Sequence, residues 1–102
     1  MDYLFTYGTL QDPQVQLYVF DKILEGDVDF LLGFKWYKNA VYGRYPLVKP
    51  TSNPKEMVKG VAYKVTKADL LRCDVYETSA YQRKKFILKS GKEAWVYIEN
   101  SK

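Results

Sequence analysis

The first quarter of the chain predicts a strand followed by a helix. A run rich in aromatic and β-branched residues at 3–7 ends at Gly8, which is the pattern of a strand that enters a turn. The Asp-Pro pair at 12–13 is typical of a helix N-cap and first helical position. Apolar residues then recur at helical spacing, and Gly26 stands where a helix would stop. We therefore predict a helix over about 13–24.

The rest of the chain predicts short strands and one further helix. Thr66, with Asp69 three positions later, resembles a capping box and predicts a helix over about 67–76. A Ser-Gly turn at 90–91 predicts a hairpin. The expected extended segments are 28–43 (one or two strands with a bend), 45–49, 59–65, 81–89 and 92–98, and a surface loop is expected over 50–55.

The last predicted strand is apolar on both faces. Ala94, Val96 and Ile98 share one face, and Trp95 and Tyr97 share the other. A strand of this kind suits a curled sheet that is filled within and packed by helices outside. We expect an α+β fold in a single domain over residues 1–102, because a chain of this length builds one core.

Two residue counts exclude whole classes of mechanism. The chain has no histidine, which removes Ser-His-Asp and Cys-His catalysis and histidine-ligated zinc. Its one cysteine, Cys73, allows neither an intrachain disulfide nor a cysteine cluster for a metal. Any general acid or base must then be Asp, Glu, Lys, Tyr or the thiol. We expect no cofactor and no metal, and a reducing, cytoplasmic environment.

The net charge of +4 is concentrated in the second half of the chain. Residues 52–102 hold 11 basic and 6 acidic residues, whereas residues 1–51 hold 5 and 6. Such a surface can attract nucleic acid, but no RNA- or DNA-binding motif accompanies the charge, so we interpret it as a solvated lysine surface. No apolar run is long enough to span a membrane.

Glu77 is the most informative candidate for catalysis. Leu70, Cys73 and Glu77 fall at i, i+3 and i+7 of the second predicted helix, so one stripe carries all three. A carboxylate in an apolar pocket has a raised pKa, which suits proton transfer near neutrality. The alternative is that the helix ends earlier and the side chain points to water.

Two further features have both a functional and an ordinary interpretation. The turn at Tyr7-Gly8-Thr9-Leu10 can gather backbone N–H groups on an anion or a carbonyl oxygen, or it can be a simple strand-to-helix connection. Tyr81 and Arg83, two apart on a strand, can stand beside Glu77, or they can be a core tyrosine and a rim arginine.

Six short segments together make the chain similar to a known family. They are YGTL at 7–10, YP at 45–46, VKGVAYKV at 58–65, DVYE at 74–77, YQRKKF at 81–86 and AWVYI at 94–98. In this order they resemble the gamma-glutamylcyclotransferase-like family, over nearly the whole chain. The chain departs from the family pattern at Cys73, where leucine is frequent, and at Thr78, where a small residue often follows the glutamate.

The resemblance implies a small, mixed, barrel-like β-sheet with two helices packed outside, and it implies an enzyme. Such an enzyme releases 5-oxoproline from a small-molecule gamma-glutamyl amine, amino acid or peptide, by attack of the substrate's own α-amine. The alternative is a binding module that keeps the pocket and lacks the reaction. By the match, Glu77 is the general acid and base. The implied substrate-binding residues are Tyr7, Gly8, Thr9, Leu10, Tyr45, Tyr81 and Arg83.

Overall fold

Strands and helices follow one another in the predicted order. The computed structural model describes residues 2–41, 43 and 45–100. The strands are β1 (Asp2–Thr6), β2 (Gly26–Leu32), β3 (Phe34–Val41), β4 (Tyr45–Pro50), β5 (Met57–Val65), β6 (Tyr81–Ile87) and β7 (Glu93–Glu99). The helices are α1 (Pro13–Phe20) and α2 (Lys67–Glu77), and two short 3₁₀ turns are η1 (Thr9–Gln11) and η2 (Thr78–Ala80).

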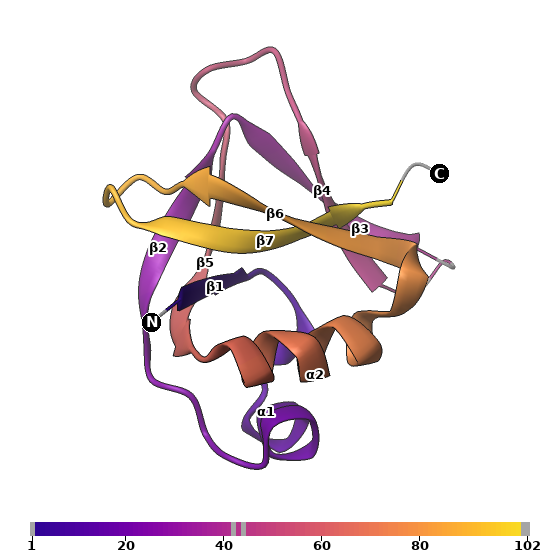
Figure 1. Ribbon diagram of the computed structural model, residues 1–102. Coiled ribbons are helices and arrows are strands. Elements are labelled where there is room, and N and C mark those ends of the chain that lie inside the picture. Colours follow the sequence, from indigo (N-terminus) through magenta and orange to yellow (C-terminus); the bar gives the residue numbers. More distant parts are fainter. Residues whose placement is uncertain (1, 42, 44, 101–102) are drawn as a thin grey trace.

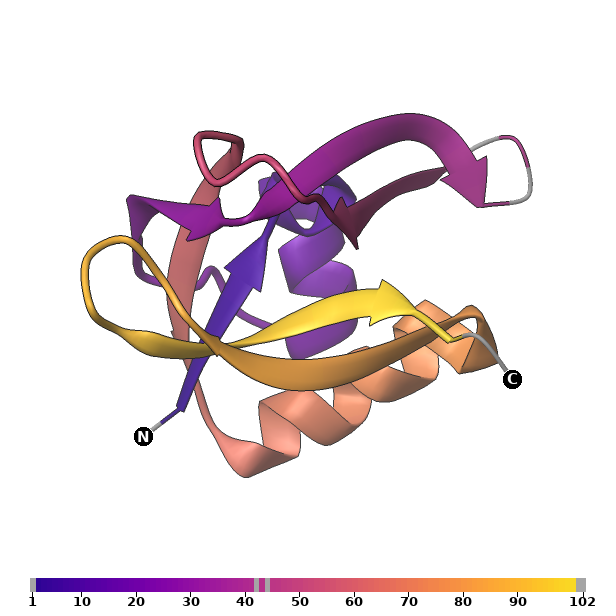
Figure 2. The ribbon, with the colours of Figure 1, turned by 90° about the horizontal axis from the view of Figure 1, so that it is seen from above.

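Five strands form a mixed sheet in the order β2-β5-β1-β7-β6, and β3 pairs with β4 in a separate two-stranded sheet. β1 runs parallel to β7, and the other neighbours in the large sheet are antiparallel. Figure 1 shows both helices on one side of the sheet and the β3–β4 pair on the other, and Figure 2 shows the same arrangement from above. The predicted α+β class, with a mixed sheet and two helices outside it, is confirmed.

The two outer strands of the large sheet approach each other through the turn that follows β6. The backbone N–H of Lys89 donates to the carbonyl of Phe30 on β2 at 2.9 Å. The carboxylate of Asp29, which is buried, accepts bonds from the backbone N–H and the hydroxyl of Ser90. These bonds join the turn after β6 to β2, so they bring the two edges of the sheet together. β6 ends at Ile87, two residues before the predicted end at Lys89.

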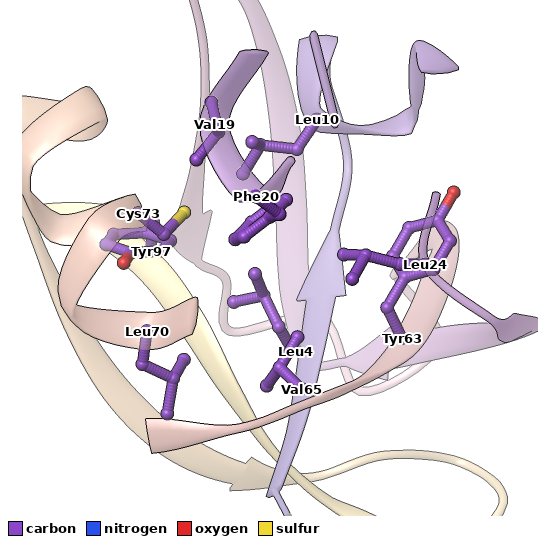
Figure 3. Packing of buried hydrophobic residues seen from close by; sticks show 10 residues of the cluster. All are labelled: Leu4, Leu10, Val19, Phe20, Leu24, Tyr63, Val65, Leu70, Cys73 and Tyr97. Atoms are coloured by element: carbon purple, nitrogen blue, oxygen red, sulfur yellow. The ribbon is translucent and has the colours of Figure 1, made fainter. Parts of the chain in front are cut away.

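Apolar side chains fill both faces of the sheet, as the alternation in the last strand predicts. One cluster, which includes Leu4, Phe20 and Leu70, lies between the sheet and the helices (Figure 3). The other, which includes Phe5 and Val48, lies on the side of β3 and β4. Because both faces are covered, the sheet is a rigid base for the groups along its edges.

The first helix is shorter than predicted. It ends at Phe20, because Asp21 adopts the left-handed conformation (φ 59°) and its N–H bonds back to the carbonyl of Leu17. Gly26 is therefore not the helix stop that the sequence suggests; it opens β2. At the other end the prediction is confirmed, since Asp12 caps the helix by accepting from the N–H of Gln14.

The second helix begins where the sequence predicts. The Thr66 hydroxyl accepts from the N–H of Asp69, and the Asp69 carboxylate accepts from the N–H of Thr66, which is a complete capping box. The helix continues to Glu77, so the carboxylate stands on its last turn. Among the described residues, no helix is both long and apolar enough to cross a membrane.

Candidate active site

A cavity of about 390 Å³ opens between the segment after β1, the start of β4, the end of α2 and the strands β6 and β7. Most of its walls are aromatic or aliphatic. Glu77 is the one charged residue among the described residues that line it. The lining comprises Phe5, Thr6, Tyr7, Gly8, Thr9, Leu10, Val41, Tyr45, Pro46, Tyr76, Glu77, Thr78, Ala80, Tyr81 and Tyr97.

The stripe predicted on the second helix points Glu77 into this cavity. Leu70 and Cys73 are buried at 3% and 0% exposure, and Glu77 follows them on the same face. Burial raises the pKa of Glu77 to about 7. No hydrogen bond or ion pair joins its carboxyl group to any described residue, so the group is available to a bound molecule.

The turn after β1 forms the facing wall. Its first hydrogen bond runs from the N–H of Gln11 to the carbonyl of Gly8 at 3.1 Å, so the N–H groups of Thr9 and Leu10 are not used within the turn. A side chain at Gly8 would place its Cβ 2.9 Å from the Pro46 ring, so the close approach of these two walls requires glycine. The Thr9 hydroxyl lies 3.3 Å from that of Tyr76, where the turn meets α2.

Two glutamines support this turn from behind. Gln16 is 2% exposed, and its side chain donates to the carbonyl of Leu10 and accepts from the N–H of Leu24. The Gln11 side chain donates to the carbonyl of Thr6 at 2.9 Å. A buried amide with both ends bonded fixes backbone position, so the turn is held in shape before any ligand binds.

Tyrosine hydroxyls connect the cavity walls to one another. Tyr7 donates to the carbonyl of Tyr97 at 2.5 Å, and Tyr81 donates to the carbonyl of Pro46 at 2.8 Å. Burial, and after it the nearby Tyr81 and Glu77, raises the pKa of Tyr7 far above its usual value, so this phenol stays neutral. The indole N–H of Trp36 on β3 donates to the carbonyl of Tyr7, which fastens the β3–β4 arm over the cavity.

Arg83 is not where the sequence-based hypothesis put it. It does not line the cavity. Its guanidinium bonds Asp74 through Nε at 2.7 Å and Nη2 at 3.0 Å, and it lies over the Trp95 ring at 4.4 Å. The structure thus brings together Glu77 and six of the predicted substrate-binding residues, whose roles stay predictions. Arg83 lies outside the cavity lining, against Asp74 and the Trp95 ring.

Sequence reasoning missed three residues that build the site. Tyr97 was predicted on an apolar face, but its hydroxyl donates to Asp74 at 2.7 Å. Gln16 had no signal, and Asp74 stood in the DVYE segment with no role assigned to it. A helical position tells which face a polar residue occupies and not which distant group it will meet. Asp74 finds its partners 9 and 23 residues further along the chain.

The fold and the cavity define a small α+β protein with a half-buried carboxyl group facing a main-chain turn. The chain belongs to the AIG2-like gamma-glutamyl cyclotransferase family, whose sequence model matches residues 4–102. The resemblance drawn from the six short segments is therefore confirmed. No curated protein matches the chain.

Solved structures share the fold at low sequence identity. A solution structure from Arabidopsis thaliana has a TM-score of 0.82 at 23% identity over 97% of this chain, and the chain spans 62% of that protein. An uncharacterized protein from Pyrococcus horikoshii has a TM-score of 0.75 at 21% identity; the match covers 100% of this chain and 80% of that protein. A gamma-glutamyl cyclotransferase has a TM-score of 0.72 at 19% identity; the match covers 96% of this chain and 66% of that protein.

Proposed function

We propose that the chain is an enzyme that releases 5-oxoproline from a gamma-glutamyl amine, amino acid or peptide. The family supports this reaction class. The observation that carries the proposal is the carboxyl group of Glu77, which bonds to no described residue and lies in a cavity that the Tyr7–Leu10 turn also lines; burial raises its pKa to about 7. A group with this pKa exchanges protons readily at neutral pH.

In the proposed reaction one carbon–nitrogen bond forms at the γ-carbonyl carbon, another breaks there, and one proton passes between the two nitrogens. The α-amine of the substrate attacks its own γ-carbonyl carbon, and a new carbon–nitrogen bond closes a five-membered ring. The bond from that carbon to the leaving amine then breaks. Glu77 as carboxylate takes the proton from the attacking nitrogen, and as carboxylic acid it gives a proton to the leaving nitrogen. Substrate and Glu77 supply every atom, so we propose no cofactor.

The enzyme's larger contribution is to hold the substrate bent. Ring closure within one residue is fast once the two reacting atoms are kept in contact, because the entropy is lost on binding. The N–H groups of Thr9 and Leu10, which make no hydrogen bond within the turn, suit a substrate carboxylate or the developing oxyanion. The rings of Tyr7, Tyr45 and Tyr81 form walls against which the bent chain packs.

Turnover is the direct test of this proposal. Purified protein is incubated with a panel of gamma-glutamyl amines, dipeptides and a tripeptide, and 5-oxoproline is measured by mass spectrometry. We expect release by the wild type and a loss of at least about 100-fold in Glu77→Gln, since the variant can neither take nor give the proton. Glu25→Gln, at an exposed glutamate outside the cavity, is the matched control and keeps wild-type activity.

The competing function is ligand binding without reaction. The same panel is titrated by calorimetry against the wild type at pH 7. Saturable binding with no 5-oxoproline from any substrate identifies a binding module, and equal turnover in Glu77→Gln and wild type rejects the proposed role of the carboxyl group.

A further inference from the structure

Asp74 stands one turn before Glu77 on α2 and is bonded from two strands. Its carboxylate accepts two bonds from Arg83 on β6, at 2.7 and 3.0 Å, and one from the Tyr97 hydroxyl on β7, at 2.7 Å. Positions i and i+3 are neighbours on a helix surface, so these three bonds hold the same turn of α2 that carries Glu77.

The bonded chain continues to the turn on the other side of the cavity. Tyr97 is 4% exposed, and its carbonyl accepts from the hydroxyl of Tyr7 at 2.5 Å. Arg83, Asp74, Tyr97 and Tyr7 therefore link β6, α2, β7 and the segment after β1. These are the elements that place Glu77 and the Tyr7–Leu10 turn, so a shift in any one of the four side chains moves the facing walls relative to each other.

Asp74 and Arg83 also form a charge pair beside Glu77. Burial alone would raise the pKa of Asp74, but the bonds from Arg83 and Tyr97 outweigh it and hold that pKa below its usual value. The carboxylate is therefore ionised and matched by a guanidinium, and at Glu77 the two charges oppose each other. In accord with this, burial is what raises the pKa of Glu77.

Among the described residues that line the cavity, the side chains that can ionise, apart from Glu77, are tyrosines. Tyrosines face it from the segment after β1, from β4, from α2, from β6 and from β7; they are Tyr7, Tyr45, Tyr76, Tyr81 and Tyr97. On its own helix lie Asp74 and Cys73. Burial raises the pKa of Cys73, Tyr7 and Tyr97, so these groups stay protonated and neutral.

We propose that Asp74 and Arg83 are positioning residues for Glu77: their bidentate pair, with Tyr97, fixes the last turn of α2, and their opposite charges cancel at the Glu77 carboxyl group. The inference deepens the proposed function, on which it rests, because a carboxyl group that both takes and gives a proton works best with a pKa near the working pH, and an unbalanced neighbouring charge would shift that pKa. It replaces the sequence-based role of Arg83 as a substrate ligand.

The pair predicts opposite effects from its two members. Asp74→Asn keeps the shape of the side chain and leaves the Arg83 cation unopposed, so the pKa of Glu77 falls. Arg83→Gln leaves the Asp74 carboxylate unopposed, so the pKa of Glu77 rises. We expect each shift to be about 0.5–1 unit, in opposite directions. A purely structural role would not reverse the sign between the two variants.

The experiment measures the Glu77 titration directly. Side-chain carboxyl carbons of ¹³C-labelled glutamate are followed by NMR from pH 4.5 to 9, with Glu77→Gln used to assign the signal. Lys85→Gln is the matched control, because it removes a cation from the same face of β6. The Lys85 ammonium lies over the same Trp95 ring at 5.1 Å, and it pairs with Glu93 and not with Asp74. It leaves the titration of Glu77 within about 0.2 units of wild type, since exposed charges are well screened.

A conservative variant separates charge from geometry. Arg83→Lys keeps the cation and loses the two-bond fork. We expect its Glu77 titration to match wild type, with kcat lowered about 10-fold and KM nearly unchanged, because the reacting groups are less well aligned. If Asp74→Asn does not fold, the comparison of Arg83→Gln with Arg83→Lys decides. A Glu77 pKa that is raised in Arg83→Gln and returns to the wild-type value in Arg83→Lys supports the inference.

Shifts of the same sign in Asp74→Asn and Arg83→Gln, or no shift in either folded variant, would overturn the inference. These readouts do not depend on turnover. A protein that releases no 5-oxoproline, yet shows the two opposite shifts, refutes the proposed function and leaves the charge pair intact.

Discussion

Replacing Glu77 by glutamine removes a charge that the fold keeps largely away from water, so the variant's stability advantage must grow with pH. The pKa of Glu77 is about 7 in the folded protein, against an ordinary value of 4.5. Between these two values the folded state binds more protons than the unfolded state, and the stability of the wild type therefore falls as pH rises. Above pH 7 the full cost is present.

The size of the effect follows from the difference between the two pKa values. A difference of 2.5 units between 4.5 and about 7, at 1.36 kcal/mol per unit, gives about 3 kcal/mol. Glutamine has nearly the same shape and no charge to bury. We therefore expect Glu77→Gln to be more stable than wild type by about 3 kcal/mol at pH 8.5 and by less than about 1 kcal/mol at pH 5.

Urea denaturation followed by tryptophan fluorescence provides the measurement, at pH 5, 6, 7 and 8.5 for both proteins. The control is Glu25→Gln, at an exposed position, which we expect to stay within about 0.5 kcal/mol of wild type at every pH. A Glu77→Gln variant that gains no stability at pH 8.5, or a gain that is the same at all four pH values, refutes the claim that this carboxyl group is buried without a partner.

Three other outcomes test the site and its support. The proposed reaction begins with Glu77 as the carboxylate, so in rates measured from pH 5.5 to 8.5 we expect kcat/KM to rise with pH and to level off above about pH 7. Gly60→Ala loses about 3 kcal/mol or more in thermal unfolding, because the new Cβ would lie 2.1 Å from the backbone oxygen of Thr6; a normal melting temperature contradicts this packing. Thr66→Ala removes the hydroxyl that accepts from the N–H of Asp69 and costs about 1 kcal/mol in urea denaturation; an unchanged midpoint means that the cap adds no stability.

Local patterns predicted those parts of the fold that local physics determines. The capping box at Thr66 located the start of α2, and helical spacing from Leu70 placed Glu77 on the buried stripe. The end of α1 was missed, because the left-handed conformation of Asp21 depends on the chain that follows and leaves no mark in the periodicity.

The partner of Arg83 lay outside the reach of the sequence for a related reason. Two residues that share a strand face have a known spacing, which is why Arg83 was expected beside Tyr81 and Glu77. Which side of α2 the guanidinium reaches depends on how the helix crosses the sheet, and that crossing is set by packing over the whole core. Long-range bonds such as Arg83 to Asp74 therefore become visible with the fold.

One wall of the cavity comes from the β3–β4 arm, which is separate from the large sheet. Val41, Tyr45 and Pro46 line the same cavity as Glu77, but their strands, β3 and β4, form a two-stranded sheet of their own. Substitutions in these residues can reshape the cavity while Glu77, its helix and the Asp74–Arg83 pair stay as they are. Natural variation, or a laboratory library confined to β3 and β4, can therefore change which molecules fit the cavity without disturbing the rest of the site.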